Sequence, residues 1–207
     1  MYNSIYNNPL ERSSNFYSNC FWDNAFTEEE LIKINEYCSQ LELQTGTTVG
    51  TLEPEKLEKI RKSNVNFIKR TDDNGWIFDR FNQIIYLVNE RFYNFSLNGY
   101  SSIQYTTYTE EDKGFYNWHM DMHHDRSNDS IHSDPQHRKL SMTFLLNDDF
   151  EGGDFEICVG NPETPRKIDT HKGRAIFFPS FFIHRVTPVT KGTRKSLVIW
   201  VTGNKFY

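Results

Sequence analysis

The stretch RAIFFPSFFIHRVTPVTKGTRKSLVIW, residues 174–200, decides the fold class of this 207-residue chain. Its apolar and β-branched residues gather in two short runs, which begin at residues 174 and 195 and are separated by Pro and Gly. Short runs of this composition, bounded by turn residues, are typical of β-strands. We therefore expect the C-terminal part of the chain to form a series of short strands.

From Gly99 onward the sequence has the two-residue period of β-strands, and further strand-like segments are SSIQYTTYTE, KLSMTFLLN and GDFEICVG. Before Gly99 the apolar residues follow a helical period instead. Thr27 and Glu30 form a capping box that predicts a helix over 28–42, and an apolar stripe predicts a second helix over 77–95. Shorter predicted elements are a strand within 16–26, a brief helix opened by Pro54 and a strand over 64–70.

Two helices followed by a run of strands predict a mostly β fold with flanking helices, of the α+β class. The expected architecture is an antiparallel sandwich or barrel with the helices packed on one face. We treat 1–98 as an N-terminal arm with supporting helices and strands, and 99–207 as the strand-rich core of the same domain. The aromatic content of 15% suits such a core.

Composition excludes several classes of protein. The formal net charge of −5 does not predict nucleic-acid binding by bulk charge. Cys20, Cys38 and Cys158 are too widely spaced for a zinc motif and odd in number, so we expect reduced thiols. No apolar run has the length of a membrane span, and the polar N-terminus lacks the centre of a signal peptide. These features predict a cytoplasmic protein without a membrane partner.

The stretch WHMDMHHD, residues 118–125, crowds imidazole and carboxylate groups together. Such a set suits Fe, Zn, Cu or Ni, although a polar loop that happens to contain His is the alternative. In an extended segment, His119 and Asp121 would point to the same side and supply two ligands. The polar segment 122–138 that follows is long for a compact loop, which favours either a flap beside a site or a solvated loop.

A third ligand would have to come from a distant strand. His184 lies in an aromatic and apolar context, where an unpartnered imidazole is costly, whereas His171 lies in a turn-like DTHKGR segment. His184 is therefore the better candidate. Arg194 begins the last predicted strand, from which it could hold a carboxylate behind the metal. Its alternative role, taken singly, is a surface salt bridge.

Three motifs in order carry a family resemblance: HMD at 119–121, EGGDFE at 151–156, and FPSFFIHRVTPVTKGTR at 178–194. Together they resemble the iron- and 2-oxoglutarate-dependent dioxygenases of the prolyl 4-hydroxylase type, and most closely the bacterial and phage enzymes. The resemblance runs from about residue 100 to the end of the chain. It implies that 99–207 is a catalytic double-stranded β-helix, also called a jelly roll.

The resemblance also implies roles for single residues. His119, Asp121 and His184 match the Fe(II) ligands, and Arg194 matches the basic residue that binds the distal carboxylate of 2-oxoglutarate. Further matches to cosubstrate or pocket positions are Tyr108, Tyr116 and Ser141. One departure is Leu145, which stands where many prolyl hydroxylases have a tyrosine that contacts 2-oxoglutarate.

The remaining histidines receive no catalytic role. His123 and His124 would fill positions that O2 and 2-oxoglutarate need, so we expect them to begin the flap, where His123 could face the substrate. His132 and His137 are expected to be solvated loop residues.

The implied reaction is hydroxylation of a C–H bond of a prolyl residue in a peptide or protein, with release of succinate and CO2. Its cofactors would be Fe(II) and 2-oxoglutarate, with O2 as cosubstrate and ascorbate as a candidate reductant. The same chemistry on another amino-acid side chain, a free amino acid or a nucleic acid stays open. So does a non-catalytic metal-binding jelly roll that acts as a sensor or binding module. The implied location is the cytoplasm of a bacterium or of a phage-infected host cell.

Overall fold

The computed structural model describes residues 17–48, 53–122, 137–161 and 163–204. The predicted N-terminal arm over 1–15 and most of the predicted flap lie outside these ranges, together with His123, His124 and His132. The described helices are α1 (Glu28–Ser39), α2 (Pro54–Ile60) and α3 (Gly75–Val88), and a π-helical turn, Asn89–Tyr93, continues α3. Among the described residues, no helix has the length and hydropathy needed to cross a membrane.

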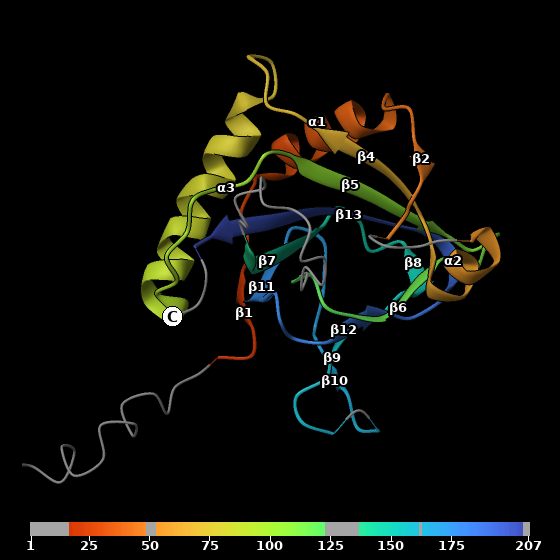
Figure 1. Cartoon of the computed structure of the whole chain (residues 1–207). Coiled ribbons are helices and arrows are strands. Elements are labelled where there is room, and N and C mark those ends of the chain that lie inside the picture. Colours follow the sequence, from red (N-terminus) through yellow and green to blue (C-terminus); the bar gives the residue numbers. More distant parts are fainter. Residues whose placement is uncertain (1–16, 49–52, 123–136, 162, 205–207) are drawn as a thin grey trace, which may run out of the picture.

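Two antiparallel sheets form the body of the molecule (Figure 1). The larger sheet has the order β1 (Cys20–Trp22), β11 (Ala175–Pro179), β7 (His137–Leu145), β13 (Val189–Gly203), β5 (Ile103–Thr109), β4 (Asn64–Ile68) and β2 (Gln44–Thr45), while β8 (Phe150–Gly152) pairs with β13. The smaller sheet has the order β10 (Arg166–Lys167), β9 (Phe155–Ile157), β12 (His184–Val186), β6 (Phe115–His119) and β3 (Arg61–Lys62). The prediction of a mostly β, antiparallel fold with flanking helices is confirmed.

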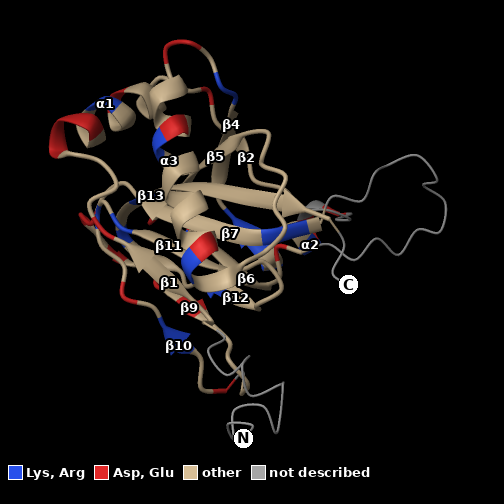
Figure 2. Cartoon of the chain, turned by 90° about the vertical axis from the view of Figure 1, so that its left-hand side faces the viewer, with Lys and Arg blue, Asp and Glu red and all other residues tan. Residues whose placement is uncertain are grey.

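The capping box at the start of α1 is formed as the sequence predicts. Glu30 donates its backbone N–H to Thr27 Oγ1 at 3.2 Å, and Thr27 donates its own to Glu30 Oε2 at 2.8 Å. Three glutamates in the first turn, red in Figure 2, complement the positive end of the helix dipole. The helix ends at Ser39, three residues before the predicted end.

The second helix differs from its prediction at its C-terminal end. Asn89 donates to the carbonyl of Phe95 and accepts from its N–H, both at 2.9 Å. The last turn is a π-helix, closed by the 2.7 Å bond from the N–H of Asn94 to the carbonyl of Asn89, and it ends where Asn94 takes a left-handed backbone at φ 52°. The predicted strand within 16–26 is also shorter, since only Cys20–Trp22 pairs and Asn24 takes a positive φ of 55°.

Apolar side chains form two clusters on opposite faces of the larger sheet. One cluster joins α1 and α3 to the sheet through residues such as Ile34, Phe81 and Phe144. The other lies toward the smaller sheet and contains Phe155 and Phe178. Strands β1, β2 and β4, which come from the first 98 residues, belong to the same sheet as the core strands. The site described next lies beside the second cluster.

Candidate metal and cosubstrate site

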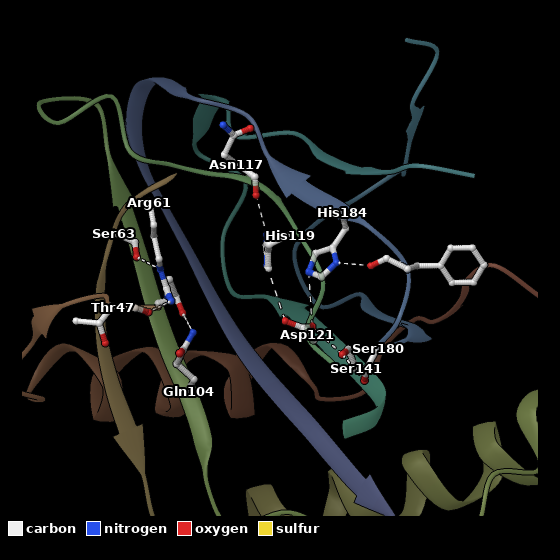
Figure 3. Close-up of polar contacts among 12 residues, drawn as sticks. Thr47, Arg61, Ser63, Gln104, Asn117, His119, Asp121, Ser141, Ser180 and His184 are labelled. Carbon is white, nitrogen blue, oxygen red and sulfur yellow. Dashed lines mark hydrogen bonds and ion pairs between the residues drawn. The ribbon is translucent and has the colours of Figure 1, made fainter. Parts of the chain in front are cut away.

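His119, Asp121 and His184 converge at one end of the smaller sheet (Figure 3). His119 ends β6, His184 begins β12, and the two residues are direct partners across the strand pair. His119 Nε2 lies 3.8 Å from Asp121 Oδ1, and His184 Nε2 lies 3.5 Å from Asp121 Oδ2. The three ligand atoms all lie within 4.8 Å of one another. Within the described ranges this is the one such group of His, Cys, Asp or Glu.

Backbone carbonyls orient both imidazoles. His119 Nδ1 lies 2.7 Å from the carbonyl of Asn117, and His184 Nδ1 lies 2.9 Å from the carbonyl of Phe182. A carbonyl oxygen only accepts, so Nδ1 carries the proton in each ring and donates it. In the neutral form of each ring Nε2 is then the nitrogen with a free lone pair, and it faces Asp121, as a metal ligand must.

Two hydrogen bonds hold Asp121, which lies in the loop after β6. The backbone N–H of Asp121 donates to the carbonyl of Ser180 at 3.0 Å, and Ser141 Oγ donates to Asp121 Oδ2 at 2.7 Å. Ser180 Oγ lies 2.9 Å from Ser141 Oγ and extends this chain of hydroxyls. The carboxylate is thus fixed from behind, with its remaining lone pairs toward the histidines.

Burial and neighbouring groups shift the pKa values of His119 and Asp121. Desolvation, with His184 nearby, lowers the pKa of His119 to about 3. Burial by itself would raise the pKa of Asp121, but His184, His119 and the Ser141 hydroxyl outweigh it and the pKa is lowered. At neutral pH the site presents a carboxylate and a neutral His119 imidazole. Two imidazoles and one carboxylate with open positions are the donor set of non-haem Fe(II) oxygenases, so the residues present fit Fe(II).

Arg194 enters the same site from β13. A cavity of about 40 Å³ is lined by the triad, Arg194, Tyr108 and Tyr116. The Arg194 side chain is 2% exposed, and its Nη1 donates to Ser196 Oγ at 3.0 Å. Its buried Nε has no hydrogen-bond partner among the described residues. Burial lowers the pKa of Arg194, so an unpaired guanidinium here is unfavourable until a ligand carboxylate accepts from it.

Residues 103–202 match the 2OG-Fe(II) oxygenase superfamily. The resemblance seen in the sequence is thereby confirmed, and the triad and Arg194 all lie inside the matched residues. Curated relatives match over a shorter stretch. A PKHD-type hydroxylase of Alteromonas mediterranea is 38% identical over 91 residues, which are 42% of this chain and 37% of that protein. Another from a Picosynechococcus strain is 44% identical over 64 residues, 30% of this chain and 28% of that protein. The chain thus spans between about a quarter and two fifths of the length of the relatives it matches.

Solved structures share the fold over most of the chain. A prolyl-4-hydroxylase of Pseudomonas putida aligns with a TM-score of 0.70 and 16% identity, covering 91% of this chain and 94% of that one. A prolyl hydroxylase of Trichoplax adhaerens, in complex with a hypoxia inducible factor peptide fragment, aligns with a TM-score of 0.68 and 18% identity, covering 98% and 94%. The fold is therefore the jelly roll that these two structures share.

The other residues predicted to contact the cosubstrate or the pocket differ in whether they line the cavity. Tyr108 and Tyr116 line the cavity, and the Tyr116 ring stacks on His119 with centroids 3.4 Å apart. Ser141 does not line it, because its hydroxyl turns to Asp121. Thr143, two residues along the same face of β7, lines the cavity instead. The structure thus gives Ser141 a contact with the carboxylate, and its expected contact with the cosubstrate stays a prediction.

Two histidines lie away from the site. His171 pairs with Asp23 at 3.2 Å and is 45% exposed on its side chain, as expected for a turn residue. His137 was predicted to be in a solvated loop, but it begins β7 opposite Gly203 and is half-buried, so that prediction is wrong. The pairing with the far end of β13 extends the strand beyond the apolar run that predicted it.

Sequence reasoning missed several residues of the cavity. Arg61, Gln104 and Trp200 line it together with the triad. The alternation of β5 and β13 could have placed Gln104 beside Tyr108 and Trp200 beside Arg194. No pattern in the sequence could have brought Arg61 there, because it depends on the pairing of β3 with β6.

Proposed function

We propose that this protein is an Fe(II)- and 2-oxoglutarate-dependent dioxygenase that hydroxylates a C–H bond of a prolyl residue in a peptide or protein, with release of succinate and CO2. The observation that carries the proposal is the placement of the His119–Asp121–His184 triad and the unpaired Arg194 in one buried cavity. A structural metal site would have no use for a buried guanidinium that has no carboxylate partner among the described residues.

In this proposal the triad residues hold Fe(II), and Arg194 holds the distal carboxylate of 2-oxoglutarate. The bound iron and cosubstrate supply the oxidising chemistry. The Asn117 and Phe182 carbonyls orient the two imidazoles, and Ser141 fixes Asp121. Phe155 and Phe178 line the cavity beside His184 and exclude water from it.

The proposal of a prolyl substrate rests on similarity to other proteins. Relatives of 33–44% identity over part of the chain are named PKHD-type hydroxylases, and solved structures with the same fold are prolyl hydroxylases. The Trichoplax structure holds a peptide fragment, which supports a peptide or protein as the substrate class. The half-buried Tyr116 on β6 lines the cavity and offers aromatic surface beside the triad.

The test is an assay of succinate and peptide mass. The anaerobically purified protein is given Fe(II), 2-oxoglutarate, ascorbate and air, with and without a proline-rich peptide. We expect succinate to rise with the peptide and the peptide to gain one oxygen atom. Succinate without a product would keep the oxygenase and reject that peptide. Absence of succinate despite bound iron would favour a binding module.

Asp121→Ala is the matched loss-of-function variant. It removes one of three ligands, so iron-dependent succinate formation should fall to background while circular dichroism shows a folded protein. Asp148→Ala, at an exposed loop position, should keep full activity. Undiminished succinate formation by Asp121→Ala would refute the ligand assignment.

A further inference from the structure

The partners of the arginines separate them into two groups. Nine arginines lie in the described ranges. Four of them pair with carboxylates: Arg70 with Asp79, Arg80 with Glu30, Arg174 with Asp23 and Asp169, and Arg185 with Glu156. Arg91 and Arg166 are exposed to solvent. The last three are Arg61, Arg138 and Arg194, which are buried or half-buried and line cavities at the triad. None of the three has a carboxylate partner among the described residues.

Arg194 has its proposed ligand in 2-oxoglutarate, whereas Arg61 has none. Arg61 is 5% exposed, and among the described residues it donates only to neutral acceptors, Ser63 Oγ at 2.6 Å and the Thr47 carbonyl at 3.1 Å (Figure 3). Its Cζ lies 4.7 Å from the centroid of the Tyr116 ring, across the β3–β6 pair. These contacts fix the guanidinium beside the triad without neutralising its charge.

Arg138, at the start of β7, likewise has no carboxylate partner among the described residues. Its Cζ lies 3.9 Å from the centroid of the Trp200 ring, which holds it flat against β13. Burial lowers the pKa of Arg138, while Asp121 and Tyr116 act in the opposite direction. Asp121 is thus close enough to act on Arg138 electrostatically, but its carboxylate is held by Ser141 and faces the histidines.

Both arginines line a second cavity, of about 180 Å³, which adjoins the inner one. The two cavities share Arg61, Gln104, Tyr116, Asp121 and Trp200. Asp121 is the one carboxylate among the described residues of this outer cavity, and bound Fe(II) would offset its charge. Among the described residues, two fixed guanidinium groups therefore leave an excess of positive charge in the cavity that adjoins the metal site.

We propose that the outer cavity is a substrate subsite for a carboxylate, which Arg61 and Arg138 bind beside the C–H bond to be hydroxylated. The inference rests on the proposed oxygenase function and makes it narrower, since the substrate must carry an acidic group near the target residue. A guanidinium presents a fork of N–H donors that matches a carboxylate, and a partly buried pair discriminates against a neutral amide of the same shape. The carboxylate has two possible sources, an acidic side chain within a peptide or the terminal carboxylate of a peptide or free amino acid.

Three small probes separate these sources. They are acetyl-Glu-Pro-amide with a side-chain carboxylate, acetyl-Gln-Pro with a terminal carboxylate, and acetyl-Gln-Pro-amide with neither. Each is titrated calorimetrically into the full chain loaded with Mn(II) and saturating 2-oxoglutarate, so that the triad and Arg194 are already occupied. Metal and 2-oxoglutarate binding are measured first and separately, so a failure of the proposed function is recognised before any probe is added.

We expect at least one carboxylate probe to bind about tenfold or more tightly than the neutral probe. Arg138→Gln should abolish this preference, and Arg61→Gln should do the same if it folds, whereas Arg166→Gln at an exposed strand position should leave it intact. Equal binding of all three probes, no binding of either carboxylate probe at millimolar concentration, or a preference that survives in Arg138→Gln would overturn the proposal. The probe that is preferred identifies the source of the carboxylate.

Discussion

The two faces of the larger sheet differ in polarity although the same strands form both. In β7, Met142 and Phe144 pack toward the helices, while Ser141 and Thr143 face the site. In β13, Leu197 and Ile199 belong to the helix-side cluster, while Arg194 and Ser196 line the cavity. The alternation of side chains along a strand thus separates an apolar face from a polar one residue by residue.

The helix-side face is built from close apolar contacts. Phe26, Phe81 and Phe144 meet edge to face with ring centroids 5.1 to 5.5 Å apart, and both Phe81 and Phe144 are fully buried. The site face instead buries Arg194, Asp121 and His184, which is unfavourable unless ligands pair with them. The comparison predicts that mutations on the first face change stability, and mutations on the second face change ligand binding.

The largest effect should follow Phe144→Ala on the helix-side face. Removing a fully buried ring in contact with two others should lower the free energy of unfolding by about 3 to 5 kcal/mol. Phe67→Ala, at a β4 position that is 47% exposed, should cost less than about 1 kcal/mol. Urea unfolding followed by circular dichroism measures both values. Equal losses in the two variants would contradict the division of roles between the faces.

A smaller effect, of a different kind, is expected for Arg194→Gln on the site face. The variant keeps a side chain of similar length but removes the charge, so the KM for 2-oxoglutarate should rise by about hundredfold. The unfolding free energy without 2-oxoglutarate should not fall, because a buried unpaired charge has been removed. Arg166→Gln serves as the control for loss of a surface charge. A KM close to that of the unaltered protein would show that another residue holds the cosubstrate.

Sequence periodicity could predict the helix-side face because it depends on local patterns. The capping box at Thr27 and the apolar stripe of α3 specify which residues meet the sheet. His184 was also predictable, since an imidazole between Phe182 and Val186 needs a partner. The ends of elements were less so: the side chain of Asn89 changes the last turn of α3 by binding Phe95, which periodicity does not register.

The rest of the site depends on contacts between distant strands. Arg61 reaches the triad because β3 pairs with β6, and Arg138 does so because the start of β7 lies against Trp200. The contact of Ser141 with Asp121, which leaves Thr143 to line the cavity, has a similar cause. The turn after β6 carries Asp121 against the end of β11, where the Ser180 carbonyl binds its N–H, and this places the carboxylate over Ser141. None of these contacts has a signature in the local sequence.

The smallest effect concerns Ser141, which sharpens the comparison because it touches the metal site only through Asp121. Ser141→Ala removes the donor to Oδ2, so the carboxylate can rotate away from the geometry that the two imidazoles share. Outer hydrogen bonds of this kind typically contribute about 10- to 100-fold in metal affinity, and we expect a loss near tenfold. Mn(II) titration followed by electron paramagnetic resonance measures it, and Ser141→Thr should restore most of the affinity because it restores the hydroxyl.

Ser180→Ala provides the matched control, since its hydroxyl contacts Ser141 and lies one step further from the carboxylate. It should weaken Mn(II) binding less than Ser141→Ala does. If both variants lose the same affinity and the same stability, the hydroxyl chain acts as packing between β7 and β11 and not as support for Asp121. If only Ser141→Ala weakens metal binding, the polar face extends one layer behind its ligands, into positions that on the opposite face are filled by apolar side chains alone.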